Sequence, residues 1–251
     1  MSAPRIAFIC LLLAAAPAAD ASLGGAARYD LSIGGIPIGE AQLRARVEGA
    51  RYEIAATADV GFLFWGGEGE ARAFGAALVA PVPDLAPEAY RLAYQGVTRP
   101  GAVEIDFLDG RAARHLRTPP IPPEYAANRV EIAPAHLEGV RDPLSAFVAP
   151  APADIDPDAL CRRVLPVFNG YVRFDIVLEG ALDAAPAADG AVACAARYAP
   201  VSGHRADSEG VARLRRPGAL SVSLSPLAPG LWGPHAIAVE TRFGPFRLER
   251  R

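Results

Sequence analysis

The sequence predicts a mainly β fold: a single curled antiparallel sheet closing toward a barrel or β-spiral, with one short helix packed in its concave side. Apolar and polar residues alternate in many short segments, and the 24 glycines and 24 prolines are spread along the chain, as frequent turns require. Only one segment has a clear helical pattern. About a dozen strands in one sheet favour curling, because open twisted sheets of that size tend to close or split.

The first strands are predicted to form a meander with one solvent-exposed face. In residues 28–33, Tyr29 and Leu31 alternate with polar side chains. The alternation resumes in residues 36–48 after a Gly-Gly pair, and again in residues 51–60 after a second turn. A strand with one apolar and one polar face suits an antiparallel sheet that is covered on one side only.

Prolines dominate two stretches in the middle of the chain. Residues 79–90 contain three prolines, so we predict an irregular link there. Residues 101–108 alternate as a strand, and Asp109-Gly110 predicts a tight hairpin after it. Residues 118–125 read TPPIPPEY; four prolines remove four backbone donors, so we expect an exposed loop.

Residues 142–148, DPLSAFV, give the predicted helix. Asp142 is a suitable N-cap, and Pro143 fits the first helical position, where its missing donor costs nothing. Leu144, Phe147 and Val148 then fall on one helical face. We expect this face to lie against the sheet or inside its curve. Asp156-Pro157 is compatible with a second helical turn.

The stretch from Cys161 to Cys194 contains the strongest hairpin signal. Asn169-Gly170 lies between two strand-like runs, and both residue types tolerate the positive φ that a type I′ turn needs. In residues 172–178, apolar side chains at alternate positions are separated by Arg173 and Asp175. The period of two predicts a strand with one buried face, which only Val177 interrupts.

The N-terminus has the features of an export signal. A short basic region precedes the apolar run 6–16, which is too short to span a bilayer. Ala19-Asp20-Ala21 fits the small-x-small cleavage rule, so residues 1–21 are predicted to be removed and 22–251 to form a single β-rich domain. The alternatives are a retained membrane anchor and a lipoprotein. The length of the run argues against the first, and the large residue before Cys10 against the second.

Export places Cys161 and Cys194 in an oxidising compartment as the two cysteines of the mature chain. We predict that they form a disulfide, the alternative being two buried free thiols. Two cysteines without a nearby histidine pair make a poor zinc site, so no metal site is expected.

No catalytic constellation is visible in the sequence. The chain has a net charge of −3 and hence no electrostatic reason to bind nucleic acid. Nucleophile-elbow, P-loop, zinc-protease and dinucleotide motifs are absent from the sequence. The four histidines, His115, His136, His204 and His235, are scattered without ligand-like spacing. We therefore assign no catalytic residue, no cofactor and no metal ligand.

One apolar segment breaks the strand pattern. Residues 62–65 are consecutive large apolar residues flanked by glycines, so either both faces of this segment are covered or it plugs a cavity. A plain core segment is the alternative. Together with two residues of the predicted helix, the segment supplies the candidate ligand contacts, which are Phe62, Leu63, Phe64, Trp65, Leu144 and Phe147.

Several motifs in combination resemble one family. They are Asp142-Pro143-x-Ser145, Phe168-Asn169-Gly170 followed by Arg173-Phe174-Asp175, and Cys194 with Tyr198, Pro200, Gly203 and His204. In these motifs the chain resembles the exported bacterial proteins called domain of unknown function 3108, in their alphaproteobacterial form. The resemblance implies an envelope protein with no established reaction, so it transfers no site. More loosely, the chain is similar to periplasmic lipoprotein carriers and envelope-integrity β-spirals, from which function does not follow.

Three functional hypotheses result. The first is a non-enzymatic periplasmic protein that binds an apolar ligand, such as a lipid acyl chain, in the concave sheet. The alternative is a structural or partner-binding envelope-integrity protein whose interior is filled by its own side chains. The third is a hydrolase acting on envelope lipid or polymer. After signal cleavage, no transmembrane span is expected in any of the three cases.

Overall fold

The computed structural model describes residues 22–62, 65–78, 83–96, 99–183 and 185–251, which form a single 14-stranded sheet in which every strand pair is antiparallel. The prediction of a mainly β fold is confirmed. The first half of the sheet consists of β1 (Ser22–Ile33), β2 (Ile36–Glu48), β3 (Arg51–Phe62), β4 (Trp65–Leu78), β5 (Asp84–Gly96), β6 (Gly101–Leu108) and β7 (Arg111–Thr118).

The second half mixes strands with short helical turns. It consists of α1 (Pro123–Ala126), η1 (Pro134–Leu137), β8 (Ala149–Pro150), α2 (Pro157–Cys161), β9 (Arg162–Phe168), β10 (Arg173–Ala181), β11 (Val192–Ser202), α3 (Glu209–Leu214), β12 (Leu220–Ala228), β13 (Leu231–Thr241) and β14 (Gly244–Arg250). No helix among the described residues is long and apolar enough to cross a bilayer.

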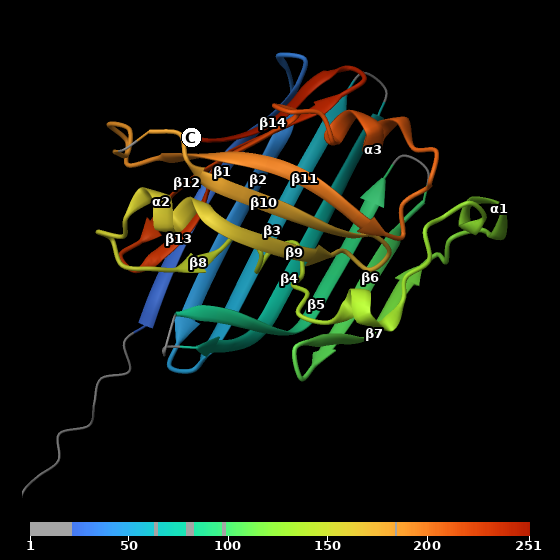
Figure 1. Cartoon of the computed structure of the whole chain (residues 1–251), viewed down its shortest axis with the longest axis horizontal. Helices are drawn as coiled ribbons and strands as arrows, with labels where there is room; N and C mark the ends of the chain where they lie inside the picture. The colour runs from blue at the N-terminus through green and yellow to red at the C-terminus, as the bar shows by residue number, and fades with distance from the viewer. Residues whose placement is uncertain (1–21, 63–64, 79–82, 97–98, 184) are drawn as a thin grey trace, which may run out of the picture.

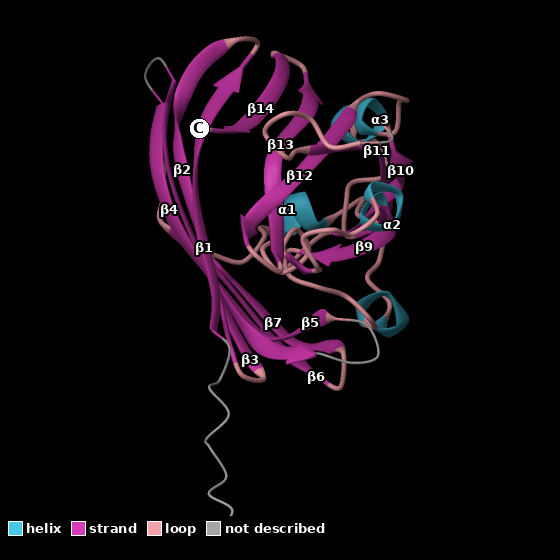
Figure 2. Cartoon of the chain, turned by 90° about the vertical axis from the view of Figure 1, so that its left-hand side faces the viewer, coloured by secondary structure: helices cyan, strands magenta, loops and turns pink. Residues whose placement is uncertain are grey.

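The strands are ordered β7-β6-β5-β4-β3-β2-β1-β14-β13-β12-β11-β10-β9, with β8 paired to β13. Each half is therefore a meander, and the pair β1–β14 joins them. β7 and β9 are the two edges. Figure 1 shows β1–β6 as one layer crossed by β9–β12, and the side view in Figure 2 shows the twisted sheet curling so that β9–β11 face its first half. The sheet is thus nearly closed into a barrel.

Period-two alternation produces the interior. Along β2 the side chains of Leu43, Ala45 and Val47 are buried, while those between them are exposed, as predicted. One buried cluster joins the inner faces of β1–β7 to Phe168, Leu227 and Leu231, and a second joins α2 and β9–β13. Together these two clusters form the hydrophobic core between the two halves of the sheet.

Residues 142–148 lie inside the curve, as predicted, but they form a hydrogen-bonded turn and not a helix. Asp142 Oδ1 accepts from the backbone N–H groups of Leu144 (2.9 Å) and Ser145 (3.0 Å), and its other oxygen accepts from the Ser145 hydroxyl. The cap therefore forms, but β8 begins at Ala149 and pairs with β13, which leaves no room for a second helical turn. Leu144 packs against the first core cluster and Phe147 against the second, so they do not share one face.

A short extended stretch, residues 138–141, bridges the two edges of the sheet, and we call it the closing segment. Gly139 N–H donates to the Gly110 carbonyl (2.8 Å) beside β7, where Glu138 forms an antiparallel bridge with Arg111. At the other edge, Arg141 N–H donates to the Pro166 carbonyl (2.7 Å), and Phe168 N–H donates to the Arg141 carbonyl (2.8 Å). The chain thus spans the gap between β7 and β9 at one point.

The Arg141 side chain anchors the closing segment to the first half of the sheet. Its Nη1 donates to the Leu85 carbonyl (2.9 Å), and Nη2 forms an ion pair with Asp84. Arg163 of β9 lies nearby with Nε and Nη2 buried and without a hydrogen-bond partner among the described residues. Burial and, secondly, the charge of Arg141 lower the pKa of this guanidinium, while Asp84 acts in the opposite direction.

The structure contains the Cys161–Cys194 disulfide, with a sequence separation of 33. It joins the end of α2, just before the edge strand β9, to β11, which lies on the other side of β10. The hairpin at Asn169-Gly170 is also present, but it is not type I′. Asn169 keeps a negative φ and its side chain accepts from Val172 N–H (2.8 Å), so only Gly170 (φ 94°) takes the left-handed region.

Two further predictions need correction. Residues 118–125, predicted as an exposed loop, are exposed except for Ile121, but residues 123–125 belong to α1. The irregular link predicted over residues 79–90 is wrong for residues 84–90, which belong to β5; Pro87 is accommodated where a register shift between Phe74 and Gly75 interrupts the β4–β5 ladder. Residues 79–82 lie outside the described residues. The short helix α3 was missed, although Ser208 caps it by accepting from Val211 N–H (3.2 Å).

Candidate functional site

The predicted ligand contacts are only partly described. Leu63 and Phe64 lie outside the described residues, as do the side chains of Phe62 and Trp65. Leu144 and Phe147 are half-buried and pack against the two core clusters. A shared role of these six residues in binding a ligand stays a prediction.

A pocket of about 610 Å³ opens at the seam between the two edges of the sheet, and we call it the seam pocket. Four parts of the chain surround it: the end of β7, the loop between β7 and the closing segment, the turn between β9 and β10, and Gly203 after β11. Its lining residues are His115, Leu116, Arg117, Pro120, Ile121, Ala126, Arg129, Val130, Glu131, Ile132, Gly170, Tyr171 and Gly203. The lining therefore combines apolar side chains with two arginines and one carboxylate.

The inner face of β7 packs against the β9–β10 turn. His115 lies opposite Ile105 and Arg117 opposite Val103, two buried residues of β6. The His115 ring meets Phe168 edge-on with centroids 5.1 Å apart, and Arg117 Cζ lies 4.7 Å from the centroid of the Tyr171 ring. Partial burial lowers the pKa of His115, which favours its neutral form.

The opposite wall of the seam pocket is a second extended stretch. Val130 N–H donates to the His204 carbonyl (2.9 Å), and Gly203 N–H donates to the Val130 carbonyl (2.8 Å). Arg129 donates from its guanidinium to the carbonyls of Tyr125 and Gly203. Residues 129–132 are therefore fixed to the segment that follows β11, and they face β7 across the pocket.

β7 keeps an unpaired backbone edge beside this pocket. Beyond the bridge at Arg111, no backbone hydrogen bond in the described part of the chain joins residues 113–117 to any strand except β6. In Figure 1, β7 is the outermost strand after β6, and α1 projects beyond it. Exposed strand edges are templates for pairing with another chain unless something covers them.

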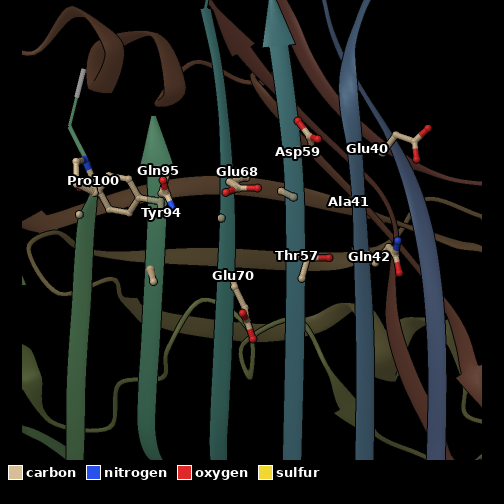
Figure 3. Close-up of a pocket in the computed structure, with 14 residues that line it drawn as sticks. Glu40, Ala41, Gln42, Thr57, Asp59, Glu68, Glu70, Tyr94, Gln95 and Pro100 are labelled. Atoms are coloured by element: carbon tan, nitrogen blue, oxygen red, sulfur yellow. The ribbon is translucent and has the colours of Figure 1, made fainter. Parts of the chain in front are cut away.

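A second hollow, of about 890 Å³, lies on the outer face of the sheet across β2–β6. Figure 3 shows the polar side chains along it, among them Glu40, Asp59, Glu68 and Glu70 on neighbouring strands. Glu40 pairs with Arg251 (2.5 Å) and Glu70 with Arg72 (2.6 Å), whereas Asp59 and Glu68 are directly opposed in the β3–β4 register. No group of three or more described His, Cys, Asp or Glu residues has the geometry of a metal site. This groove is a solvated acidic surface.

A buried polar cluster lies inside the sheet. Asp142 and Ser145 are fully buried, and Tyr52 and Tyr90 are nearly so. Burial raises the pKa of Asp142, against the opposing effect of its hydrogen bonds, and burial together with the charge of Asp142 raises the pKa of both phenols. A perturbed buried carboxyl is a common sign of a catalytic site. Here, however, its oxygens are engaged in capping the 142–148 turn and are closed to solvent.

The histidines show no catalytic pairing in the described hydrogen bonds. His136 Nδ1 accepts from Ala133 N–H (3.2 Å), and His235 lies 3.3 Å from the Asp189 carboxylate at the surface. His115 packs on Phe168, and His204 Nδ1 is buried without a described partner. A triad needs a nucleophile and a base within hydrogen-bond reach, and the described histidines do not show that arrangement.

Sequence reasoning did not find the seam pocket. Its residues come from four separate stretches, of which residues 118–125 were predicted as an exposed loop and Asn169-Gly170 as a hairpin turn. The usable signal was the arginine and histidine content of residues 111–117 in a strand directly before a proline-rich loop, since prolines and charges mark sheet edges.

The chain was compared with protein families, curated proteins and solved structures. No family model matches the chain, and no curated protein matches it, so the resemblance to domain of unknown function 3108 has no support from a family model. The crystal structure of a β-barrel-like protein of domain of unknown function 1849 from Brucella abortus is similar at 9% identity and a TM-score of 0.45, over 91% of this chain and 96% of that one. The barrel-like architecture described above rests on the strand pairing of this chain.

Proposed function

We propose that this protein is a non-enzymatic module of the bacterial envelope, exported to the periplasm, that acts by binding a partner protein. The observation that carries the proposal is the packing of the described side chains between the halves of the sheet. Two core clusters and the 142–148 turn occupy the space between the halves of the sheet, and the seam pocket opens outward. A carrier of large apolar cargo would need a lined cavity at the place where these described side chains pack.

The predicted export signal and the motif resemblance to domain of unknown function 3108 support the envelope as the location in this proposal. The lack of a paired nucleophile and base among the described side chains supports a binding role over hydrolysis. Neither point depends on the identity of the partner.

A second candidate function is binding of a small apolar ligand with an anionic group, as in a fatty acid. The specific observation in its favour is the lining of the seam pocket, where Ile121, Val130 and Ile132 accompany Arg117 and Arg129. Ligand pockets of this size are mostly apolar with a few convergent polar groups.

One experiment separates the two. A photo-crosslinking amino acid replaces Leu116 at the seam or, as the control, Arg44 on the outer face of β2, and the chain is irradiated in living cells. We expect a discrete protein adduct from position 116 and none from position 44, followed by measurable affinity between the two purified proteins. If the purified chain instead contains stoichiometric lipid and no protein adduct forms, the proposal is wrong and the second candidate function is favoured.

A further inference from the structure

We infer that the free edge of β7 binds an extended, acidic segment of the partner protein by β-strand addition, with the segment lying in the seam pocket. This inference rests on the proposed function and specifies the chemistry of the partner. Strand addition uses backbone hydrogen bonds for affinity and alternate side-chain pockets for specificity.

The first argument is the backbone. Residues 113–117 present amide and carbonyl groups at an edge to which no other described backbone is paired. Along this edge Ala113, Arg114, His115 and Leu116 are exposed, and Leu116 keeps 45% of its surface accessible despite being apolar. An incoming strand would satisfy the outward backbone groups and cover Leu116.

The second argument is the shape of the site. The seam pocket lies between two extended stretches, β7 on one side and residues 129–132 on the other, and the latter is already paired to 203–204 on its far side. Both walls therefore run as strands do, with the β9–β10 turn between them. An extended peptide fits such a slot better than a compact ligand does, and Ile121, Val130 and Ile132 can receive its apolar side chains.

The third argument is charge. Arg117 and Arg129 line the pocket; in the described part of the chain Arg117 lies over the Tyr171 ring and Arg129 donates to two backbone carbonyls, and neither faces a carboxylate in an ion pair. Glu131 is the single carboxylate in the lining. Arg114 faces the other side of β7 and is neutralised by Asp106 (3.1 Å), so the charge argument rests on Arg117 and Arg129. Complementarity therefore selects an acidic occupant.

The chain itself supplies a precedent. At the start of β7 the closing segment already adds to this edge, and the residue that forms the bridge with Arg111 is Glu138. The chain reaches this edge from η1, which is helical and does not pair with β7, and the closing segment then runs on to β9, so residues 113–117 have no described backbone partner except β6. The inferred partner segment would extend along β7 the backbone pairing that Glu138 forms with Arg111.

The probe for the test is an acetylated and amidated hexapeptide, TEVEVT, labelled with a fluorophore. We measure its binding to the purified chain by fluorescence anisotropy at low salt, and amide hydrogen exchange across β7 with and without the peptide. We expect saturable binding and slowed exchange in residues 113–117. Two control peptides are matched in length: TKVKVT, which reverses the charge, and TEVEVT with alternate amides N-methylated, which removes donors from one edge.

Two protein variants complete the design. Arg117→Glu should weaken binding of TEVEVT about fivefold, because an exposed attractive pair becomes a repulsive one. Arg44→Glu makes the same change in net charge on the outer face of β2 and should leave binding unchanged. Urea unfolding of both variants checks that the fold is retained, and if Arg117→Glu unfolds, Arg117→Gln takes its place with a smaller expected loss.

Absence of TEVEVT binding, equal binding of the N-methylated peptide, or equal loss in the two variants would overturn the inference. Such a result would leave the proposed function standing if the crosslinking experiment still identifies a binding partner. Conversely, peptide binding without any partner in cells would overturn the proposed function and leave the edge as a peptide-binding surface.

Discussion

Loss of the Cys161–Cys194 disulfide should destabilise the protein by an amount that can be worked out from its position. With a separation of 33 residues, the chain-entropy relation gives about 3–4 kcal/mol from the loss of constraint on the unfolded chain. For a domain of this length, that corresponds to a fall in Tm of about 7–14 °C. The bridge also holds the edge strand β9 to β11 across β10, so β9 should lose hydrogen-exchange protection first.

The assay is equilibrium urea unfolding of the wild-type chain, Cys161→Ser, Cys194→Ser and the double serine variant, each with and without reductant. Reductant should lower the urea midpoint of the wild type to near that of the double variant and leave the double variant unchanged. The single variants should match the double variant closely, because either change removes the same constraint. Equal midpoints for oxidised and reduced wild type, or two free thiols at these positions in the unreduced denatured chain, would refute the reasoning.

Three further predictions follow from buried charges and from export. The raised pKa of Asp142 means that its carboxyl loses a proton first in the unfolded chain, so its contribution to stability is full below about pH 4 and is lost as pH rises toward the raised value. The unfolding free energy of Asp142→Asn should therefore rise relative to that of the wild type as the pH increases above about 4, and parallel pH profiles would contradict this. Arg163→Met should raise stability by about 1 kcal/mol, because it removes buried donors without partners but keeps the packing of the stem; a lower Tm would show that the guanidinium is satisfied. Intact-mass analysis of the chain from a periplasmic extract should give a mature N-terminus at Ser22, and an uncut chain in the cytoplasm would disprove export.

Much of the sheet follows directly from sequence periodicity. Leu43, Ala45 and Val47 alternate with charged residues, and only one face of β2 can then be buried. Asp109-Gly110 predicts the β6–β7 hairpin for an equally local reason, since both residues adopt the positive φ (51° and 73°) that the tight turn needs.

The errors arise where tertiary structure decides. Residues 142–148 carry a good helix start, but the turn is enclosed between two cores, and β8 takes the next residues into the sheet. Arg173 alternates with apolar residues, which predicts an exposed side chain. It is buried because Asp175 (2.6 Å) and the His136 carbonyl (3.1 Å) satisfy its guanidinium.

The candidate site was beyond sequence reasoning for a related reason. The seam pocket depends on which two strands are left as edges, and that depends on the pairing of β1 with β14. No local pattern encodes a pairing between the two ends of the chain. The pairing of β1 with β14 leaves β7 and β9 as the two edges of the sheet. It also brings Arg117 close to Tyr171, which no local pattern predicts.

The same pairing has a consequence for how the polypeptide acquires its structure. Tyr29 donates its hydroxyl proton to the carbonyl of Pro234, 205 residues away, and Arg251 forms ion pairs with Asp30 and Glu40. During synthesis from the N-terminus, the first seven strands can order by local contacts. The free side of β1, however, cannot pair until β14 has been synthesised. Trimming residues 244–251 should therefore remove the backbone pairing between the half-sheets and leave the closing segment and the core packing to join them, whereas a circular permutant with new ends between β7 and β9 should fold faster than the natural chain.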